Sequence, residues 1–206
     1  MMLRPAAPED SRALAELIYL ADKAHYFTSG YEFSLGTDPL STLAKLTSAP
    51  ARSQFHYSHF DVAVERSGAH AAAAVAGFDR ASASEQAGDA LLQIGWTPEQ
   101  IQALVERVTP LGEDFPEEPP NTWTIEHVAT FPQYRGQGLI KRLLAKSLHR
   151  AARQGFATAS VDVFEGNHKA LAIYEAAGFR PVATFGHEPI RRILNRDPLI
   201  RLTRLI

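Results

Sequence analysis

The clearest chemistry in this sequence lies at two glycines that precede a basic helix pattern. Gly136 and Gly138 follow an apolar stretch, and the segment from Arg135 to Arg153 contains six Lys or Arg and no acid. A helix N-terminus offers unpaired N–H groups and a positive dipole end to anions, and glycines let a ligand approach the backbone. The pattern predicts a phosphate site, although a glycine pair alone also fits a surface helix with a solvated basic face.

Two common phosphate motifs do not fit this turn. A dinucleotide fingerprint requires a third glycine three residues after Gly138, where the sequence has Lys141. A P-loop requires Gly-Lys-Ser/Thr, which does not occur in the sequence. We therefore expect a phosphate ligand of another class.

Composition limits the classes of protein and of site. The 206 residues are 45% apolar and 21% charged, as in an ordinary globular domain, and the net charge of −2 gives no reason to expect nucleic-acid binding. The absence of cysteine excludes disulfides, thiolate metal sites and a cysteine nucleophile. His56 and His59 have no third ligand nearby in sequence, so no metal is expected. No apolar run approaches the roughly 18 residues of a membrane span and the N-terminus lacks a signal-peptide core, so we expect no membrane association and a cytoplasmic location.

The elements that position the glycine turn fill the chain from residue 121 onward. We expect strands at 122–130, 158–164, 180–185 and 198–206, and helices at 138–153 and 168–178. Gly155 and Gly178 end the two helices, and Asn167 caps the second. A strand–helix–strand unit of this kind predicts a parallel, right-handed crossover.

The N-terminal half has weaker signals. We expect a strand at 2–6, helices at 8–26, 38–48 and 97–108, and a hairpin over 60–80 with its turn at Ser67-Gly68. Residues 26–38 predict a loop. Residues 109–120 hold four acids and four prolines and predict an exposed irregular loop. The class is α+β.

Two patterns in the C-terminal half together resemble the GNAT N-acetyltransferase superfamily. The family pattern Arg/Gln-x-x-Gly-x-Gly/Ala is similar to Arg135-Gly136-Gln137-Gly138-Leu139-Ile140, where Ile140 replaces a small residue. The pattern Asn-x-x-Ala-x-x-x-Tyr-x-x-x-Gly-Phe is complete, with Asn167, Ala170, Tyr174, Gly178 and Phe179. The resemblance covers residues 121–185 closely and the N-terminal half only in the order of elements.

The resemblance implies a GNAT fold, in which helices flank a central mixed, mostly antiparallel sheet that splays at the fourth strand. It implies one domain over 1–206, with an acceptor-shaping half (1–120) that includes an insertion at 81–120, and an acyl-CoA-binding half (121–206). The pyrophosphate of coenzyme A is expected at the glycine turn, and its pantetheine amides along the splayed strand. The implied binding residues are Val128, Ala129, Thr130, Arg135, Gly136, Gln137, Gly138, Leu139, Ile140, Lys141, Asn167 and Tyr174.

Tyr174 is the implied general acid, which protonates the leaving thiolate. It lies seven residues after Asn167, so two helical turns place both on one face, about 10 Å apart. The alternative is a core tyrosine that packs with Leu171 and Phe179. Asn167 can act as a helix cap and touch the ligand at once.

The general base is less clearly marked. Glu126 ranks first, Asp162 second and His127 third. Neighbours on a strand face opposite sides, so only one of Glu126 and His127 can face the substrate directly. Each of the three also fits a solvated or salt-bridged strand residue, and a base that acts through water would serve as well.

The expected reaction moves an acetyl group from acetyl-CoA to a primary amine of a small molecule or peptide by direct attack. The alternative is a non-catalytic acyl-CoA-binding sensor or regulatory module. Residues 22–45 and 183–197, with Tyr26, Phe27, Tyr31 and Phe33, are expected to shape the acceptor site. The acceptor and the oligomeric state stay open, a homodimer included. Glu113, Asp114, Glu117 and Glu118 suggest an acidic rim that attracts a cationic amine, unless they form only a solvated loop.

Overall fold

The computed structural model describes residues 1–65 and 70–206, so the turn predicted at Ser67-Gly68 lies outside the described residues. The strands are β1 (Met2–Pro5), β2 (Phe60–Val64), β3 (Ala71–Phe78), β4 (Thr122–Thr130), β5 (Thr158–Phe164), β6 (Arg180–Phe185) and β7 (Leu199–Leu205). The α-helices are α1 (Ser11–Lys23), α2 (Gly30–Leu35), α3 (Pro39–Thr47), α4 (Arg80–Glu85), α5 (Ala87–Gln93), α6 (Pro98–Val108), α7 (Leu139–Arg153), α8 (His168–Ala176) and α9 (His187–Leu194). Short 3-10 helices are η1 (Pro8–Asp10), η2 (Tyr57–His59), η3 (Thr109–Gly112) and η4 (Pro132–Tyr134).

The strands form one seven-stranded sheet in the order β1-β2-β3-β4-β5-β7-β6. Neighbouring strands are antiparallel except β4 and β5, which α7 joins by the expected parallel crossover. The alanine-rich segment of β3 is a strand because all its residues are buried between two layers of helices. The predicted mixed, mostly antiparallel sheet flanked by helices is confirmed.

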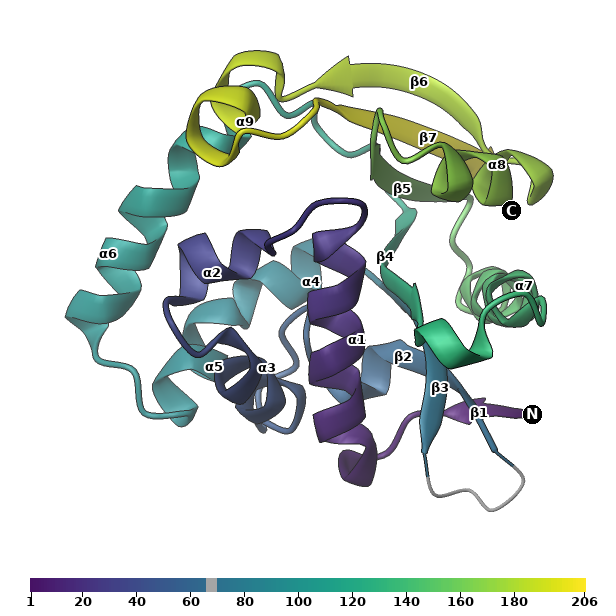
Figure 1. The fold of residues 1–206 in the computed structure, drawn as a ribbon, viewed down its shortest axis with the longest axis horizontal. Helices are drawn as coiled ribbons and strands as arrows, with labels where there is room; N and C mark the ends of the chain where they lie inside the picture. The colour runs from purple at the N-terminus through teal and green to yellow at the C-terminus, as the bar shows by residue number, and fades with distance from the viewer. Residues whose placement is uncertain (66–69) are drawn as a thin grey trace.

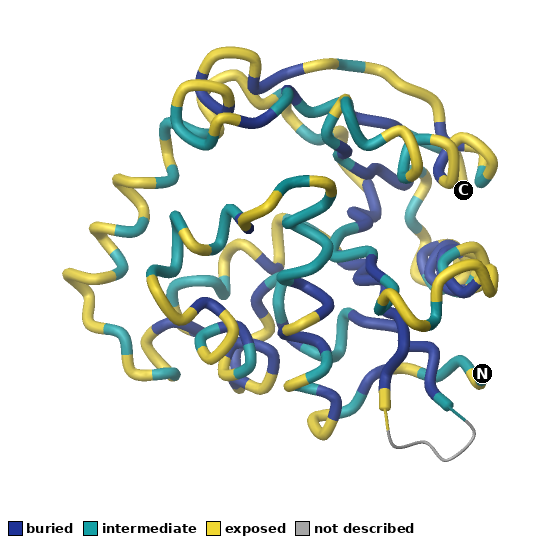
Figure 2. Tube along the Cα trace, in the orientation of Figure 1, coloured by how far each residue is buried: buried dark blue, intermediate teal, exposed yellow. Residues whose placement is uncertain are grey.

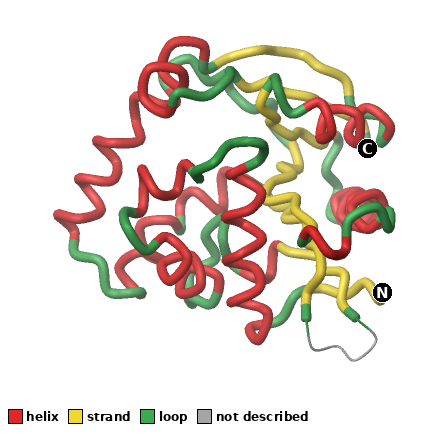
Figure 3. Tube along the Cα trace, in the orientation of Figure 1, coloured by secondary structure: helices red, strands yellow, loops and turns green. Residues whose placement is uncertain are grey.

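Helices cover both faces of the sheet, as Figures 1 and 3 show. On one face, Leu14, Leu17 and Ile18 of α1 pack with Leu43 of α3 against β2 and β3. On the other face, α7 buries its leucines, including Leu143, against β3, β4 and β5. Figure 2 shows the buried core along these strands, between the two helical layers.

Four helices lie where no helix is predicted. The predicted loop 26–38 contains α2, because Ser29 and Glu32 form a capping box. Residues 80–93 form α4 and α5, and the C-terminal segment contains α9, which begins after Gly186. The N–H of Gly186 donates to Asp114 Oδ2 at 2.8 Å, so the start of α9 depends on a distant residue.

Residues 81–120, which the sequence predicts as an insertion, cross from the N-terminal half to the C-terminal strands. In Figure 1, α6 runs from α5 toward α9. The loop after α6 is anchored to the C-terminal strands by two contacts. Phe115 packs edge-on against Phe185 with ring centroids 4.5 Å apart, and the carbonyl of Pro116 accepts a hydrogen bond from Arg201. The described helices include none with the length and apolar character of a membrane span.

Candidate active site

The glycine turn between β4 and α7 leaves a run of backbone donors free. Gly136 and Gly138 have φ of +77° and +66°, a region that favours glycine, so the turn needs both residues. Within residues 1–65 and 70–206, no acceptor takes the N–H groups of residues 136–141. A Cβ at either glycine would meet no protein atom within 4 Å, so the turn is open. Such a turn at a helix N-terminus can hold a phosphate.

The basic face of α7 serves two purposes. Lys146 and Arg150 lie 3.5 Å from the carboxylate of Asp61, which is buried in β2. Arg150 also stacks over the ring of Trp123. These two cations therefore stabilise the packing of α7, whereas Arg135 and Lys141 are exposed beside the turn. Ile140 packs against the core, so its branched side chain does not fill the turn.

Strand β4 separates from β5 halfway along its length. Their pairing ends at Ile125 and Val161, while β5 continues its pairing with β7 to Phe164. On the other edge, the register between β3 and β4 shifts between Ala74 and Ala76, and His127 has φ of +51°. This is a β-bulge, and beyond it the edge of β4 at Val128–Thr130 pairs with no strand of the described residues on the β5 side. The predicted splay is confirmed.

The second pattern occupies α8. Asn167 caps the helix, because its side chain accepts the N–H of Ala170 at 3.3 Å. The ring of Tyr174 is buried and packs edge-on against Phe179, and burial raises the pKa of its hydroxyl. No hydrogen bond within the described part of the chain holds that hydroxyl. The geometry therefore fits both readings of Tyr174, the core residue and the proton donor.

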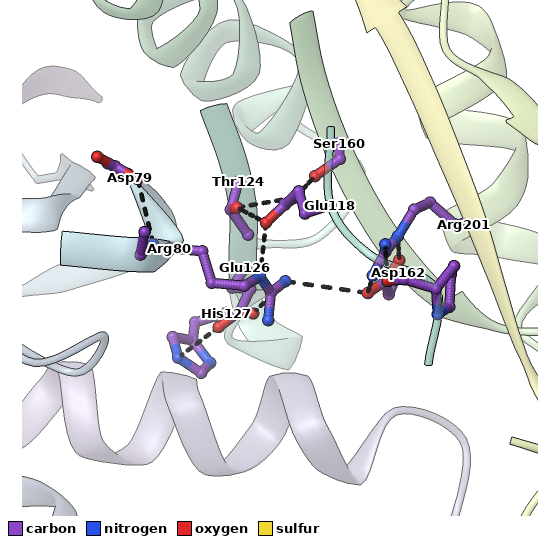
Figure 4. A network of polar contacts seen from close by, with 11 residues as sticks. Asp79, Arg80, Glu118, Thr124, Glu126, His127, Ser160, Asp162 and Arg201 are labelled. Carbon is purple, nitrogen blue, oxygen red and sulfur yellow. Dashed lines mark hydrogen bonds and ion pairs between the residues drawn. The ribbon is translucent and has the colours of Figure 1, made fainter. Parts of the chain in front are cut away.

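Glu126 lies just beyond the last β4–β5 pair, with a side chain that is 25% exposed. Its Oε1 is 2.9 Å from Arg80 Nη2 (Figure 4). Burial raises the pKa of Glu126, and the negative charges of Asp162 and Glu118 raise it further, while Arg80 opposes them. A carboxylate with a raised pKa is a better proton acceptor near neutral pH.

Asp162 forms a bidentate ion pair with Arg201 of β7. The two Nε–Oδ1 and Nη2–Oδ2 distances are 2.8 and 2.9 Å. Arg80 approaches the same carboxylate at 3.9 Å. A carboxylate held on both oxygens is tied to its partner and is less available as a base than Glu126.

His127 faces away from solvent among aromatic rings. Its ring stacks with Phe55 at 5.4 Å and Phe60 at 5.9 Å, and lies 6.5 Å from Tyr31. Burial lowers the pKa of His127 to about 4, so the imidazole is neutral at pH 7. Its Nε2 is 3.5 Å from Glu126 and accepts or donates no hydrogen bond within the described residues.

Three residues of this network are absent from the sequence-based catalytic candidates: Arg80, Glu118 and Arg201. Glu118 accepts from Arg80 Nε at 2.8 Å, from Thr124 and from Ser160 (Figure 4). It is therefore not part of a solvated acidic rim. The alternation of side chains along β7 predicts that Arg201 and Thr203 lie on the same face of the sheet. No local sequence pattern shows that Arg201 pairs with Asp162.

The two segments expected at the acceptor site are joined to each other. Arg196 donates to the carbonyls of Asp22 and Thr28 at 3.1 and 2.6 Å, and its guanidinium stacks over Tyr26. The hydroxyl of Tyr26 donates to Asp197 at 2.8 Å. Phe27, at the tip of the loop, is 96% exposed. The 22–30 segment is thus held against the β6–β7 connection.

No cluster of side chains in the described ranges 1–65 and 70–206 has the composition of a metal site. His56 caps η2 by accepting the N–H of Ser58 at 3.2 Å, and His59 contacts the carbonyl of Arg52. These contacts indicate structural roles for both histidines.

Comparison with known proteins places the chain in a structural context. Residues 96–179 match the model of the acetyltransferase (GNAT) family. No curated protein sequence matches the chain significantly. An N-acetyltransferase from Staphylococcus aureus Mu50 is similar, with a TM-score of 0.73 and 22% identity over 99% of this chain and 100% of that chain.

Two further solved structures are also similar. The ribosomal-protein-alanine N-acetyltransferase from Brucella melitensis has a TM-score of 0.57 and 13% identity over 100% of both chains. A chain of the NatC complex bound to Gag peptide and CoA has a TM-score of 0.57 and 15% identity over 100% of this chain and 98% of that chain. Identities this low show the fold alone. Together with the match at the two sequence patterns, they confirm the resemblance: the chain has the GNAT fold, and its residues 96–179 carry the sequence pattern of the GNAT acetyltransferase family.

Proposed function

We propose that this protein transfers an acetyl group from acetyl-CoA to a primary amine of a small molecule or peptide. The family match supports acyl transfer in general. One observation carries the proposal furthest: the free N–H groups of residues 136–141 lie directly after the unpaired edge of β4. A phosphate group and an extended amide chain need these two kinds of backbone partner side by side.

The residues of the chain have distinct tasks in this reaction. The glycine turn binds the pyrophosphate, and the edge of β4 at Val128–Thr130 binds the pantetheine amides. Glu126 takes a proton from the acceptor ammonium, directly or through water. The free amine attacks the thioester carbonyl, and a backbone N–H near Val128 stabilises the oxyanion. The C–S bond then breaks, and Tyr174 protonates the thiolate. The tyrosinate takes up, directly or through water, the proton that the attached nitrogen loses as the amide forms.

The proposed route is direct attack, and the sequence contains no cysteine, which excludes a thioester-linked acyl-enzyme. Among the candidate bases, we assign the role to Glu126. Asp162 is held on both oxygens by Arg201, and His127 is enclosed by Phe55 and Phe60. Glu126 is the one of the three that combines partial exposure with a raised pKa.

A non-catalytic acyl-CoA-binding module is the second candidate. The observation in its favour is that Arg80 and Arg201 pair with the two candidate carboxylates, and that Tyr174 is buried. Such a module needs the glycine turn and the β4 edge but no proton transfer. A cytoplasmic location stays a prediction for either function.

Calorimetry with acetyl-CoA, followed by a thiol-release assay with a panel of amines, tests the proposal. The panel contains small amines, amino acids, aminoglycosides and peptides with free N-termini or lysines, and mass spectrometry identifies the products. Binding with amine-dependent release of free coenzyme A supports the enzyme. Binding without release from any amine favours the module, and no binding at all contradicts both.

A further inference from the structure

Arg80 brings the insertion into the candidate active site. It is the first residue of α4, and Asp79 fixes this helix start by accepting the N–H of Ala81 at 3.1 Å. In Figure 4, the guanidinium reaches the space between Glu118, Glu126 and Asp162. Its Nε donates to Glu118 at 2.8 Å, and its Nη2 lies 2.9 Å from Glu126. One planar fork thus holds two carboxylates in fixed directions.

Glu126 has charged or titratable neighbours from every element around it. These are Arg80 of α4, Glu118 of the preceding loop, His127 of β4, Asp162 of β5 with Arg201 of β7, and Tyr31 of α2 with Asp22 of α1. His127 is neutral at pH 7 because burial lowers its pKa to about 4. In the described residues, Arg80 is the only Lys or Arg in contact with Glu126.

The balance of charge at Glu126 therefore depends on this one cation. Burial and the two neighbouring carboxylates raise the pKa of Glu126, and Arg80 lowers it. A protonated carboxyl group cannot accept a proton, so a further rise would remove the base from the neutral range. The orientation of the carboxylate also depends on the short contact to Nη2.

We propose that Arg80 is a positioning residue, which holds Glu126 ionised and oriented to accept a proton from the acceptor amine. The inference deepens the proposed function and rests on it. It also gives the predicted insertion 81–120 a task, since Arg80 directly precedes it and Glu118 lies near its end. The fork of Arg80 couples both ends to β4.

Two substitutions should move the titration of Glu126 in opposite directions. Arg80→Met removes a cation in contact and should raise the pKa of Glu126 by about 1–3 pH units. Glu118→Gln keeps the hydrogen-bonding shape but removes a like charge, so it should lower that pKa. Arg80→Lys keeps the charge without the fork and should stay close to the wild type in pKa. Loss of packing alone does not produce changes of opposite sign.

Carboxylate titration by carbon-13 NMR measures these changes in pKa, with Glu126→Gln to assign the signal. The pH profile of kcat/KM should follow them. In Arg80→Met, the acidic limb should move to higher pH, and activity at a fixed pH below the limb should fall roughly tenfold for each pH unit that the limb moves. Arg80→Lys should restore the limb but keep a lower plateau, because one ammonium cannot orient both carboxylates.

Arg4→Met is the matched control. Arg4 holds Asp10 by two hydrogen bonds of 2.6 and 2.9 Å, on β1 and far along the sheet order from β5. Its loss should lower the melting temperature and leave both the titration of Glu126 and the pH profile unchanged.

The inference is overturned if the pKa of Glu126 is unchanged in a folded Arg80→Met protein. It is also overturned if Arg80→Met and Glu118→Gln change this pKa in the same direction. If Arg80→Met does not fold, Arg80→Lys and Glu118→Gln decide it: a lower plateau of kcat/KM in Arg80→Lys and a lowered pKa of Glu126 in Glu118→Gln support the inference. A wild-type plateau in Arg80→Lys, or a pKa that does not fall in Glu118→Gln, overturns it. If the wild type acetylates no amine, the proposed function fails, while the NMR titration still decides whether Arg80 controls the protonation of Glu126.

Discussion

Gly138→Asp separates ligand binding at the glycine turn from the stability of the fold. Gly138 precedes the first residue of α7 with φ of +66°, and a Cβ there would meet no protein atom within 4 Å. Asp is one of the few residues that tolerates this backbone region, at a cost of about 1 kcal/mol. A carboxylate at a helix N-terminus recovers about 0.3–1 kcal/mol through the helix dipole. The free energy of unfolding should therefore change little.

Binding of acetyl-CoA should respond strongly to the same substitution. A carboxylate about 5 Å from a phosphate charge raises its energy by about 3 kcal/mol at an effective dielectric constant of about 20. That energy corresponds to roughly a 100-fold rise in Kd. The added side chain also fills space in front of the free N–H groups. Gly138→Asn adds similar bulk without the charge and should lose less affinity.

Gly155→Asp is the matched control at the opposite end of α7. Gly155 has φ of +85°, and a Cβ there would also meet no protein atom within 4 Å. Its carboxylate opposes the dipole at the helix C-terminus, so this variant should be less stable than Gly138→Asp by about 1 kcal/mol. It should nevertheless bind acetyl-CoA normally.

Calorimetry gives the two Kd values, and urea unfolding gives the two free energies. We expect the order of the variants to reverse between the two measurements: Gly138→Asp is the more stable and the weaker binder. An unchanged Kd in folded Gly138→Asp refutes a phosphate site at this turn. An equal loss of affinity in Gly155→Asp shows that the effect comes from α7 as a whole.

Three further predictions concern the acid, a buried histidine and the acidic loop. Tyr174→Phe should lower kcat by roughly 10²–10³ and leave acetyl-CoA affinity and stability nearly intact, because the ring packing is kept. Burial lowers the pKa of His127 to about 4, so the stability that its neutral form contributes is complete above pH 6.5 and is lost as the pH falls toward 4. Between pH 7 and 5, the free energy of unfolding should fall by about 2 kcal/mol because of this residue. His127→Asn should remove that part of the change, which urea unfolding measures as a shift of the midpoint. Glu113→Gln with Glu117→Gln should weaken the salt dependence of kcat/KM for a cationic acceptor and leave kcat unchanged.

Each of these has a contrary result. Near wild-type turnover of Tyr174→Phe, with chemistry shown to be rate-limiting, removes the proton-donor role. A full pH dependence in His127→Asn assigns the titration to His56 instead, whose pKa burial also lowers to about 4. If the double glutamine variant keeps the parent's kcat/KM at every salt concentration, the exposed acids have no part in acceptor capture.

The glycine turn and the cap of α8 are predictable because their signals are local. Positive φ values confine Gly136 and Gly138 to glycine-like residues, and Asn167 caps a helix that begins one residue later. The splay of β4 follows only from the family resemblance. Nothing in residues 122–130 alone shows that pairing with β5 stops after Ile125.

The unpredicted helices depend on contacts that no local pattern contains. The α2 helix has six residues and is held by Tyr31, which packs edge-on against Phe55 from the segment after α3. The α9 helix begins after Gly186, whose N–H donates to Asp114 from the loop 109–120. Both helices are short, so intrinsic propensity contributes little and tertiary packing decides.

The four acids of the 113–118 loop show how the fold divides residues of one composition. Glu113 and Glu117 are exposed, Asp114 accepts the N–H of Gly186, and Glu118 lies among Arg80, Thr124 and Ser160. An experiment that neutralises all four would therefore change electrostatic steering, the start of α9 and the charge beside Glu126 at once. The role of each carboxylate depends on the group that the fold places beside it, and the sequence around the carboxylate alone does not show that group. Arg80 directly precedes residues 81–120 and Glu118 lies near their end, yet Arg80 Nε and Glu118 Oε2 are 2.8 Å apart. Removal of residues 81–120 would therefore remove Glu118 together with the α4 helix that begins at Arg80, and would change the charge beside the proposed base.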